Sequence, residues 1–138
     1  MSENSKSSLQ DSGLLLIRTM VSVVLIYHGS QKLFGWFGGD GFEPFARFVG
    51  TLGLPESRIM AYAAAVSECI GGLLLLLGIA GRWPALPMAV TMGVAVWKLH
   101  LDHFSGQGGA EYPLTLCVVL VGLLFTGPGN ITLMRLFK

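Results

Sequence analysis

Charged residues are scarce in this chain, and their scarcity limits the class of protein. Of the 138 residues, 12% are charged and 52% are hydrophobic, and the mean hydropathy is +0.64. A soluble domain carries about 25% charged residues. The net charge of +1 excludes a strongly basic surface, so we expect no nucleic-acid partner. The composition indicates a membrane protein.

Cysteine is scarce as well. The chain has two, Cys69 and Cys117, and they form no Cys-x-x-Cys pair. This spacing excludes a local thiol relay and a zinc knuckle, and we predict no metal site. Free cysteines packed in apolar surroundings are the favoured interpretation. A bridge between two helices is the alternative.

Long apolar segments, in contrast, are abundant, and they predict an all-α polytopic membrane protein with a four-transmembrane-helix bundle. Prolines at helix starts and glycines at helix ends, such as Pro55 and Gly81, mark their limits. A span needs about 20 residues, so the two shorter segments require polar ends, tilt or a locally thin bilayer. The four predicted helices cover residues 13–37, 56–80, 83–104 and 112–126.

The remaining segments are predicted to lie outside the bilayer core. Residues 40–52 and 131–137 are amphipathic and are predicted to form short interfacial helices. Residues 1–12 are Ser-rich and predict a flexible polar tail before a single membrane domain, residues 13–138. Arg18 is predicted to extend toward lipid phosphates. Lys and Arg favour the side that holds both termini, which predicts cytoplasmic termini.

Polar residues gather at the opposite end of the predicted bundle. A bilayer tolerates such groups only where they face protein or water. The ends of the first and third helices and the starts of the second and fourth fall on the same side, so we predict a polar cavity in the outer half. The predicted ligand-binding residues are His28, Gln31, Lys32, Glu68, His100, Glu111 and Tyr112.

Two of these residues allow both a structural and a functional interpretation. Glu68 lies among small residues that permit close helix packing. It either forms a buried ion pair with Lys32 or exchanges protons and anchors a ligand, and the two roles are compatible. His28 either stabilises the fold by hydrogen bonding or contacts a ligand and relays protons. A b-type haem held by His28 and His100 is a third option that nothing in their spacing requires.

The order of several short motifs resembles that of the DoxX family of small four-helix membrane proteins. The resemblance covers about residues 14–136, and the spacing of the motifs is more specific than any one of them. The matching features are Arg18, His28-Gly29-x-x-Lys32-Leu33-Phe34-Gly35, Gly38-Gly39, Leu52-Gly53-Leu54-Pro55, Glu68-x-x-Gly71-Gly72, Arg82, His100, Gly108-Gly109-Ala110-Glu111-Tyr112 and Gly127-Pro128-Gly129.

The resemblance implies an integral protein of the inner (plasma) membrane that is linked to redox metabolism. Relatives are associated with a terminal oxidase and with thiosulfate:quinone oxidoreductase. We therefore expect a quinone or a similar small redox ligand in the cavity, and leave open whether the chain is a subunit of a quinone-linked oxidoreductase. The alternative is a non-catalytic membrane anchor or assembly subunit for a redox enzyme partner. A small transporter, which would require a homo-oligomer, is a third function.

Each predicted site residue has an expected role under the ligand hypothesis. His28 and Lys32 are expected to donate hydrogen bonds to a ligand oxygen. Glu68 is expected to be the buried charge partner or a proton acceptor. His100, Glu111 and Tyr112 are expected at the mouth of the cavity.

Overall fold

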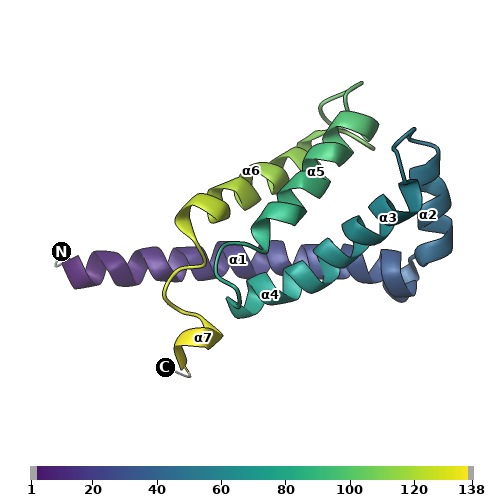
Figure 1. The fold of residues 1–138 in the computed structure, drawn as a ribbon. Helices are drawn as coiled ribbons and strands as arrows, with labels where there is room; N and C mark the ends of the chain where they lie inside the picture. The colour runs from purple at the N-terminus through teal and green to yellow at the C-terminus, as the bar shows by residue number, and fades with distance from the viewer. Residues whose placement is uncertain (1–2, 137–138) are drawn as a thin grey trace.

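The computed structural model describes residues 3–136, and these residues form helices and loops without a strand (Figure 1). The all-α prediction is therefore confirmed. Two short elements interrupt the α-helices: a 3₁₀ turn, η1 (Trp36–Gly38), and a π-helical turn, η2 (Ser67–Gly71). The α-helices are α1 (Glu3–Phe34), α2 (Phe42–Gly50), α3 (Ser57–Val66), α4 (Gly72–Leu77), α5 (Ala85–Leu99), α6 (Glu111–Thr126) and α7 (Leu133–Leu136).

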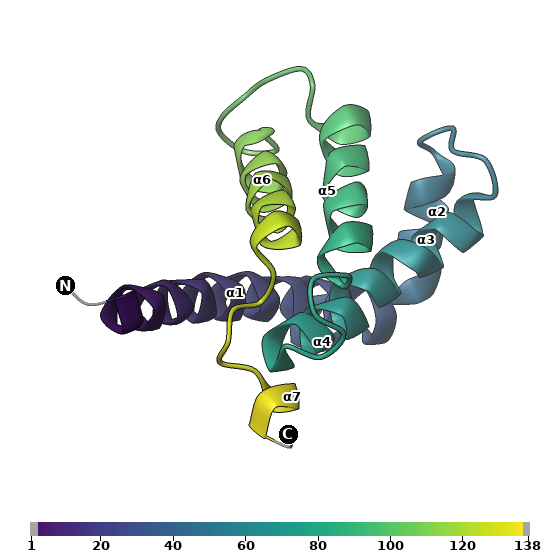
Figure 2. The same cartoon turned by 60° about the vertical axis from the view of Figure 1, so that its left-hand side comes forward.

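Three groups of helices form the fold (Figures 1 and 2). The first consists of the long helix α1 alone. The second is the continuous rod of α3, η2 and α4, which packs against α1. An antiparallel hairpin of α5 and α6 is the third group, and α2 lies beside α3. The core forms where α1, α4, α5 and α6 meet, and its fully buried side chains include Leu25, Leu75, Met88 and Leu120.

Two helices are long and apolar enough to cross a bilayer, over residues Lys6–Phe34 and Ser57–Leu77. The helices α5 and α6 have 15 and 16 residues. At about 1.5 Å per residue, 15 residues span about 23 Å, less than the roughly 30 Å hydrocarbon core. The bundle of four spanning helices therefore stays a prediction.

The first helix begins earlier than predicted. Residues 1–12 were expected to form a flexible tail, yet α1 already begins at Glu3, and residues 1–2 lie outside the described range. The Asp11 carboxylate accepts hydrogen bonds from the backbone and side-chain nitrogens of Asn130, both at 2.9 Å. This contact holds the polar start of α1 against the loop that follows α6.

Two other boundaries also differ from the prediction. The third apolar helix ends at Leu99 rather than at residue 104, because the following residues fold back on themselves. In that loop, the backbone nitrogen of Glu111 donates to the Phe104 carbonyl at 2.8 Å. The predicted interfacial helix at residues 131–137 is shortened to α7, and residues 137–138 lie outside the described range.

Arg18 does not reach toward lipid phosphates, and that prediction is wrong. Its side chain is 2% exposed. The guanidinium donates to the carbonyl oxygen of Pro128 and, at 2.8 Å, to that of Ile131. A buried charge needs such hydrogen bonds to compensate for lost hydration. Arg18 therefore fastens the loop after α6 to α1.

Candidate functional site

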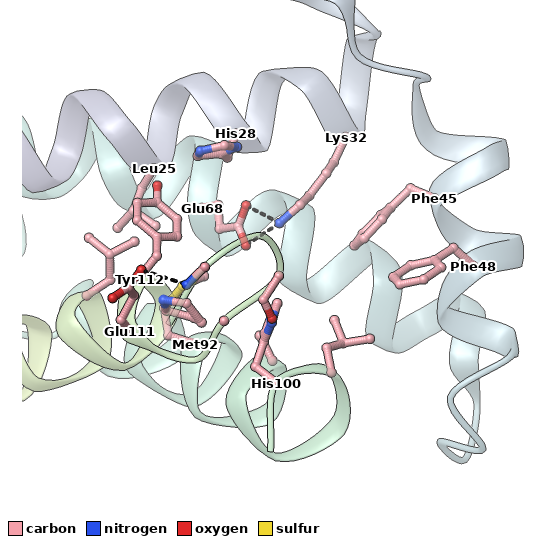
Figure 3. A pocket seen from close by; sticks show the side chains of 17 residues that line it. Leu25, His28, Lys32, Phe45, Phe48, Glu68, Met92, His100, Glu111 and Tyr112 are labelled. Atoms are coloured by element: carbon pink, nitrogen blue, oxygen red, sulfur yellow. Dashed lines mark hydrogen bonds and ion pairs between the residues drawn. The ribbon is translucent and has the colours of Figure 1, made fainter. Parts of the chain in front are cut away.

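A cavity of about 340 Å³ lies among the C-terminal half of α1, the helix α2, the π-turn η2 and the loop end of the α5–α6 hairpin (Figure 3). Gln31 does not line it, although it contacts a residue that does. The other six predicted ligand-binding residues line it together: His28, Lys32, Glu68, His100, Glu111 and Tyr112.

An ion pair between Lys32 and Glu68 forms one wall of the cavity. The Lys32 Nζ atom lies 2.5 Å from each carboxylate oxygen of Glu68. The Glu68 side chain is fully buried, whereas 27% of the Lys32 side chain is exposed. Lys32 Nζ also lies 5.2 Å from the ring centroid of Phe45, a cation–π distance. The predicted pairing of Lys32 and Glu68 is confirmed, and Lys32 is the partner that a ligand can reach.

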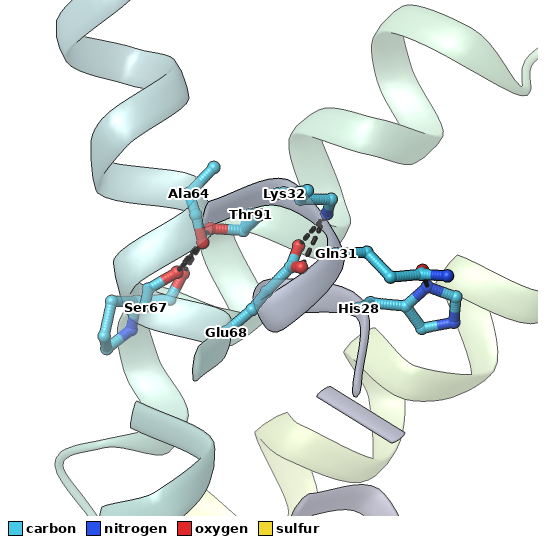
Figure 4. Close-up of polar contacts among 8 residues, drawn as sticks. His28, Gln31, Lys32, Ala64, Ser67, Glu68 and Thr91 are labelled. Carbon is cyan, nitrogen blue, oxygen red and sulfur yellow. Dashed lines mark hydrogen bonds and ion pairs between the residues drawn. The ribbon is translucent and has the colours of Figure 1, made fainter. Parts of the chain in front are cut away.

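The π-turn η2 presents Glu68 to the cavity. A π-turn adds one residue to a helical turn, and such turns are frequent at functional sites. Ser67, at its start, donates to the Ala64 carbonyl at 2.9 Å and lies 3.1 Å from the Thr91 hydroxyl on α5 (Figure 4). This turn was not predicted from the sequence, in which the Gly71-Gly72 pair at the end of the turn is the one local sign of unusual packing.

Close packing of α1 on the turn brings the ion pair together. A Cβ atom placed on Gly29 would lie 2.4 Å from the backbone nitrogen of Cys69. One placed on Gly72 would lie 3.0 Å from Ile26. Glycine at these two positions lets the helix backbones touch, as small residues do between membrane helices. The predicted close packing of helices around Glu68 is therefore confirmed.

His28 is held by Gln31 and by two aromatic rings. His28 Nδ1 lies 3.1 Å from Gln31 Oε1 (Figure 4). Gln31 Nε2 donates to the Phe37 carbonyl at 3.2 Å. The rings of Tyr27 and Tyr112 approach the imidazole edge-on, with centroids at 5.5 and 5.9 Å. Gln31 thus contributes to the site by orienting a neighbour.

The loop between α5 and α6 forms the mouth of the cavity. His100 Nδ1 lies 2.5 Å from the carbonyl oxygen of Gly108, which ties the end of α5 to the start of α6. Glu111 accepts a long hydrogen bond from the backbone nitrogen of Gly106, at 3.4 Å. Tyr112 is 48% exposed at the same edge. All three residues line the cavity at its loop end.

Apolar side chains form the rest of the lining. Leu25 and Met92 come from α1 and α5, while Phe45 and Phe48 come from α2 (Figure 3). Residues 40–52 were predicted to form an amphipathic helix, but the sequence did not indicate that this helix, α2, would border the cavity. An amphipathic pattern shows that a face is covered, without showing what covers it.

An exposed ion pair also links α2 to the start of α3. Arg58, at the start of α3, donates to both carboxylate oxygens of Glu43, at 2.5 and 3.0 Å. These hydrogen bonds hold the pKa of the Glu43 carboxyl below its usual value. The pair therefore keeps its charges through the neutral range.

Cysteine and metal chemistry receive little support from the geometry. Cys69 and Cys117 are both free thiols. Within residues 3–136, no group of three or more His, Cys, Asp and Glu side chains is placed to hold a metal ion. The cavity can instead offer an ammonium, an imidazole and a phenol around an apolar space. This combination can hold a small oxygen-bearing ring by hydrogen bonds and apolar contact.

Comparison with known proteins identifies the family. The family model described as DoxX matches residues 13–101. The chain belongs to the DoxX family. The DoxX match extends from α1 to the loop after α5, so it includes His28, Lys32, Glu68 and His100 and ends before Glu111.

Curated relatives span most of the chain. A Bacillus subtilis protein named "Putative oxidoreductase CatD" is 32% identical over 115 residues, covering 83% of this chain and 79% of that protein. An uncharacterized Haemophilus influenzae protein is 30% identical, and the match covers 91% of this chain and 83% of that protein. The "Uncharacterized membrane protein Rv3486" of Mycobacterium tuberculosis is 28% identical, and the match covers 88% of this chain and 79% of that protein. No solved structure matches this DoxX chain.

Proposed function

We propose that this DoxX protein crosses the inner membrane four times and binds a quinone or a similar small redox ligand in its polar cavity. The observation that carries the proposal is the placement of the Lys32–Glu68 pair. The carboxylate is fully buried, while the ammonium borders an open space of about 340 Å³. An ion pair that only locked two helices would not need a cavity beside it.

The lining fits a flat, oxygen-bearing ring. The cavity volume falls within the range of about 300–1,000 Å³ that is usual for small-molecule sites. Lys32 supplies a charged hydrogen-bond donor, and Phe45 and Met92 supply apolar surface for a ring. The names of two relatives, an oxidoreductase and a membrane protein, support a redox role at a membrane.

The alternative function is that of a membrane anchor for a redox enzyme, which requires no ligand in the cavity. The two functions are distinguished by purifying the protein, extracting any bound lipids and cofactors, and analysing them by mass spectrometry and visible absorption. A copurified quinone supports the ligand site, and a Soret band would instead support haem. A ligand-free protein that copurifies with a soluble redox enzyme supports the anchor.

Labelling of introduced cysteines tests the proposed topology. Ser7 and Ser105 are exposed, and we expect them on opposite sides of the membrane. In a background with Cys69 and Cys117 replaced by alanine, an impermeant maleimide added to intact spheroplasts should label Ser105→Cys. It should label Ser7→Cys only after the cells are broken. Labelling of both from one side contradicts four spans.

The substitution His28→Ala should abolish binding of an alkyl-substituted benzoquinol, the reduced form of a quinone, to the purified protein. The imidazole is part of the cavity wall, and its removal takes away a polar group that orients the ligand. Truncation of a half-buried ring beside a cavity should leave the helices folded. Equilibrium dialysis in detergent measures the binding, and circular dichroism checks the fold.

The matched control is His103→Ala. His103 lies in the exposed loop outside the cavity, where its Nε2 contacts the Gln107 carbonyl at 3.3 Å. This variant should bind the benzoquinol as the unmodified protein does. Equal binding by the His28 and His103 variants would remove His28 from the site. Absence of binding by every form, with support of a partner enzyme intact, would favour the anchor.

A further inference from the structure

Gln31 determines which ring nitrogen of His28 carries the proton. A backbone carbonyl only accepts hydrogen bonds, so Gln31 must turn its amide nitrogen toward the Phe37 carbonyl, at 3.2 Å. The amide oxygen then faces His28 Nδ1, at 3.1 Å. Because an amide oxygen also only accepts, Nδ1 must carry a hydrogen. In the neutral imidazole, Nε2 is then a bare acceptor.

This acceptor belongs to a ring that borders the cavity. His28 lines the cavity, and none of the hydrogen bonds found within residues 3–136 uses its Nε2 atom. The edge contacts with Tyr27 and Tyr112 restrict rotation of the imidazole. Lys32 lies four residues further along α1, a spacing that puts two side chains about 5–6 Å apart at Cβ.

The cavity therefore offers one acceptor and one donor on the same stripe of α1. The Lys32 ammonium only donates, and two of its contacts go to Glu68. The matching ligand has a hydroxyl that donates to His28 Nε2 and a second oxygen that accepts from Lys32. A quinone carries two carbonyl acceptors, so its oxygen would face the lone pair of Nε2 without a hydrogen between them.

We propose that the cavity selects the reduced, hydroxyl-bearing form of its ligand, a quinol rather than a quinone, and that Gln31 is the positioning residue for this choice. The inference rests on the proposed ligand site and deepens it. It also changes the role of His28, which the sequence analysis expected to be a donor. Glu68 does not set this preference, because both its oxygens face Lys32.

Nitrogen NMR of ¹⁵N-labelled histidine tests the tautomer without any ligand. At about pH 8, where an imidazole is neutral, His28 should show a protonated Nδ1 and an unprotonated Nε2. The signal is assigned by its loss in His28→Asn. In Gln31→Met the acceptor for Nδ1 is gone, so His28 should shift toward the Nε2-protonated form that predominates in water. Gln31→Glu keeps a carbonyl-type acceptor and should keep the Nδ1-protonated form.

Binding measurements test the preference itself. The probes are an alkyl-substituted benzoquinol under reducing conditions, the matching benzoquinone, and the dimethyl ether of the quinol. The unmodified protein should bind the quinol about tenfold more tightly than the other two, the size of one hydrogen bond. Gln31→Met should lower this ratio toward one. Gln10→Met, the same change on an exposed position of α1 outside the cavity, should leave it unchanged.

The outcomes separate this inference from the proposed function. Equal binding of quinol and quinone, or a protonated Nε2 in the unmodified protein, overturns the hydroxyl preference and leaves the ligand site standing. Failure of the folded protein to bind any of the three probes overturns the ligand site, and the preference falls with it. A quinol preference that survives Gln31→Met would show that Gln31 does not set it.

Discussion

Substitution of Lys32 by methionine should lower the free energy of unfolding by roughly 3–5 kcal/mol, the usual effect of leaving one buried charge without its partner. Glu68 is fully buried and has Lys32 on both oxygens. Glu68→Gln should cost less, because a lysine left alone is 27% exposed and can turn toward water. The double variant should cost less than the sum of the two single variants. Thermal unfolding in detergent measures all four proteins.

The exposed pair Arg58–Glu43 provides the matched control for this double-mutant cycle. It has similar contact distances, but its side chains are 67% and 59% exposed. Exposed pairs are screened by water and salt, so Arg58→Met and Glu43→Gln should show little coupling. Strong coupling in both pairs would indicate a general effect of charge removal. Additive effects of the Lys32 and Glu68 substitutions would contradict their contact.

Substitution of Gly29 by alanine should lower the free energy of unfolding by about 3 kcal/mol, the upper part of the range for overpacked sites. The added Cβ would meet the backbone nitrogen of Cys69 at 2.4 Å, and a backbone cannot move aside as a flexible side chain can. Alanine is more favourable than glycine inside a helix by about 1 kcal/mol, which is too little to offset the clash. The π-turn that carries Glu68 would have to move away from α1.

Gly13→Ala is the control for this steric argument. Gly13 lies in the same helix, and nothing lies within 4 Å of an added Cβ. This variant should be as stable as the unmodified protein or slightly more stable. Gly29→Ala should also weaken the coupling between Lys32 and Glu68 and reduce quinone binding. A Gly29→Ala protein as stable as Gly13→Ala would contradict the close packing at this position.

The pairing of Lys32 with Glu68 could be predicted because a carboxylate among small residues in a membrane helix requires a partner. The grouping of six residues around the cavity could be predicted because, in an antiparallel bundle, the ends of the first and third helices and the starts of the second and fourth lie at the same end. The π-turn at Ser67–Gly71 could not be predicted, because its hydrogen bonding depends on how α1 packs there. The contribution of Phe45 depends in the same way on where α2 docks.

The boundaries that failed share one physical cause, which is a hydrogen bond to a residue that the local apolar pattern does not indicate. The start of α1 is helical where Asp11 meets Asn130, 119 residues further along the chain. The end of α5 is set by the loop that His100 and Gly108 close. Local pattern and composition carry no information about such partners. Arg18 is a third case, because its polar partners are backbone carbonyls, which every sequence contains.

The Arg18 contacts impose an order of events on biosynthesis. A ribosome completes Arg18 long before it adds the residues that receive its hydrogen bonds, which lie 110 and 113 positions later. Until then the guanidinium has no carbonyl partners in this loop, and burial without them would be costly. We therefore expect the part of α1 around Arg18 to stay hydrated until translation has passed Ile131. Arg18 thereby delays final assembly until nearly every helix has been made.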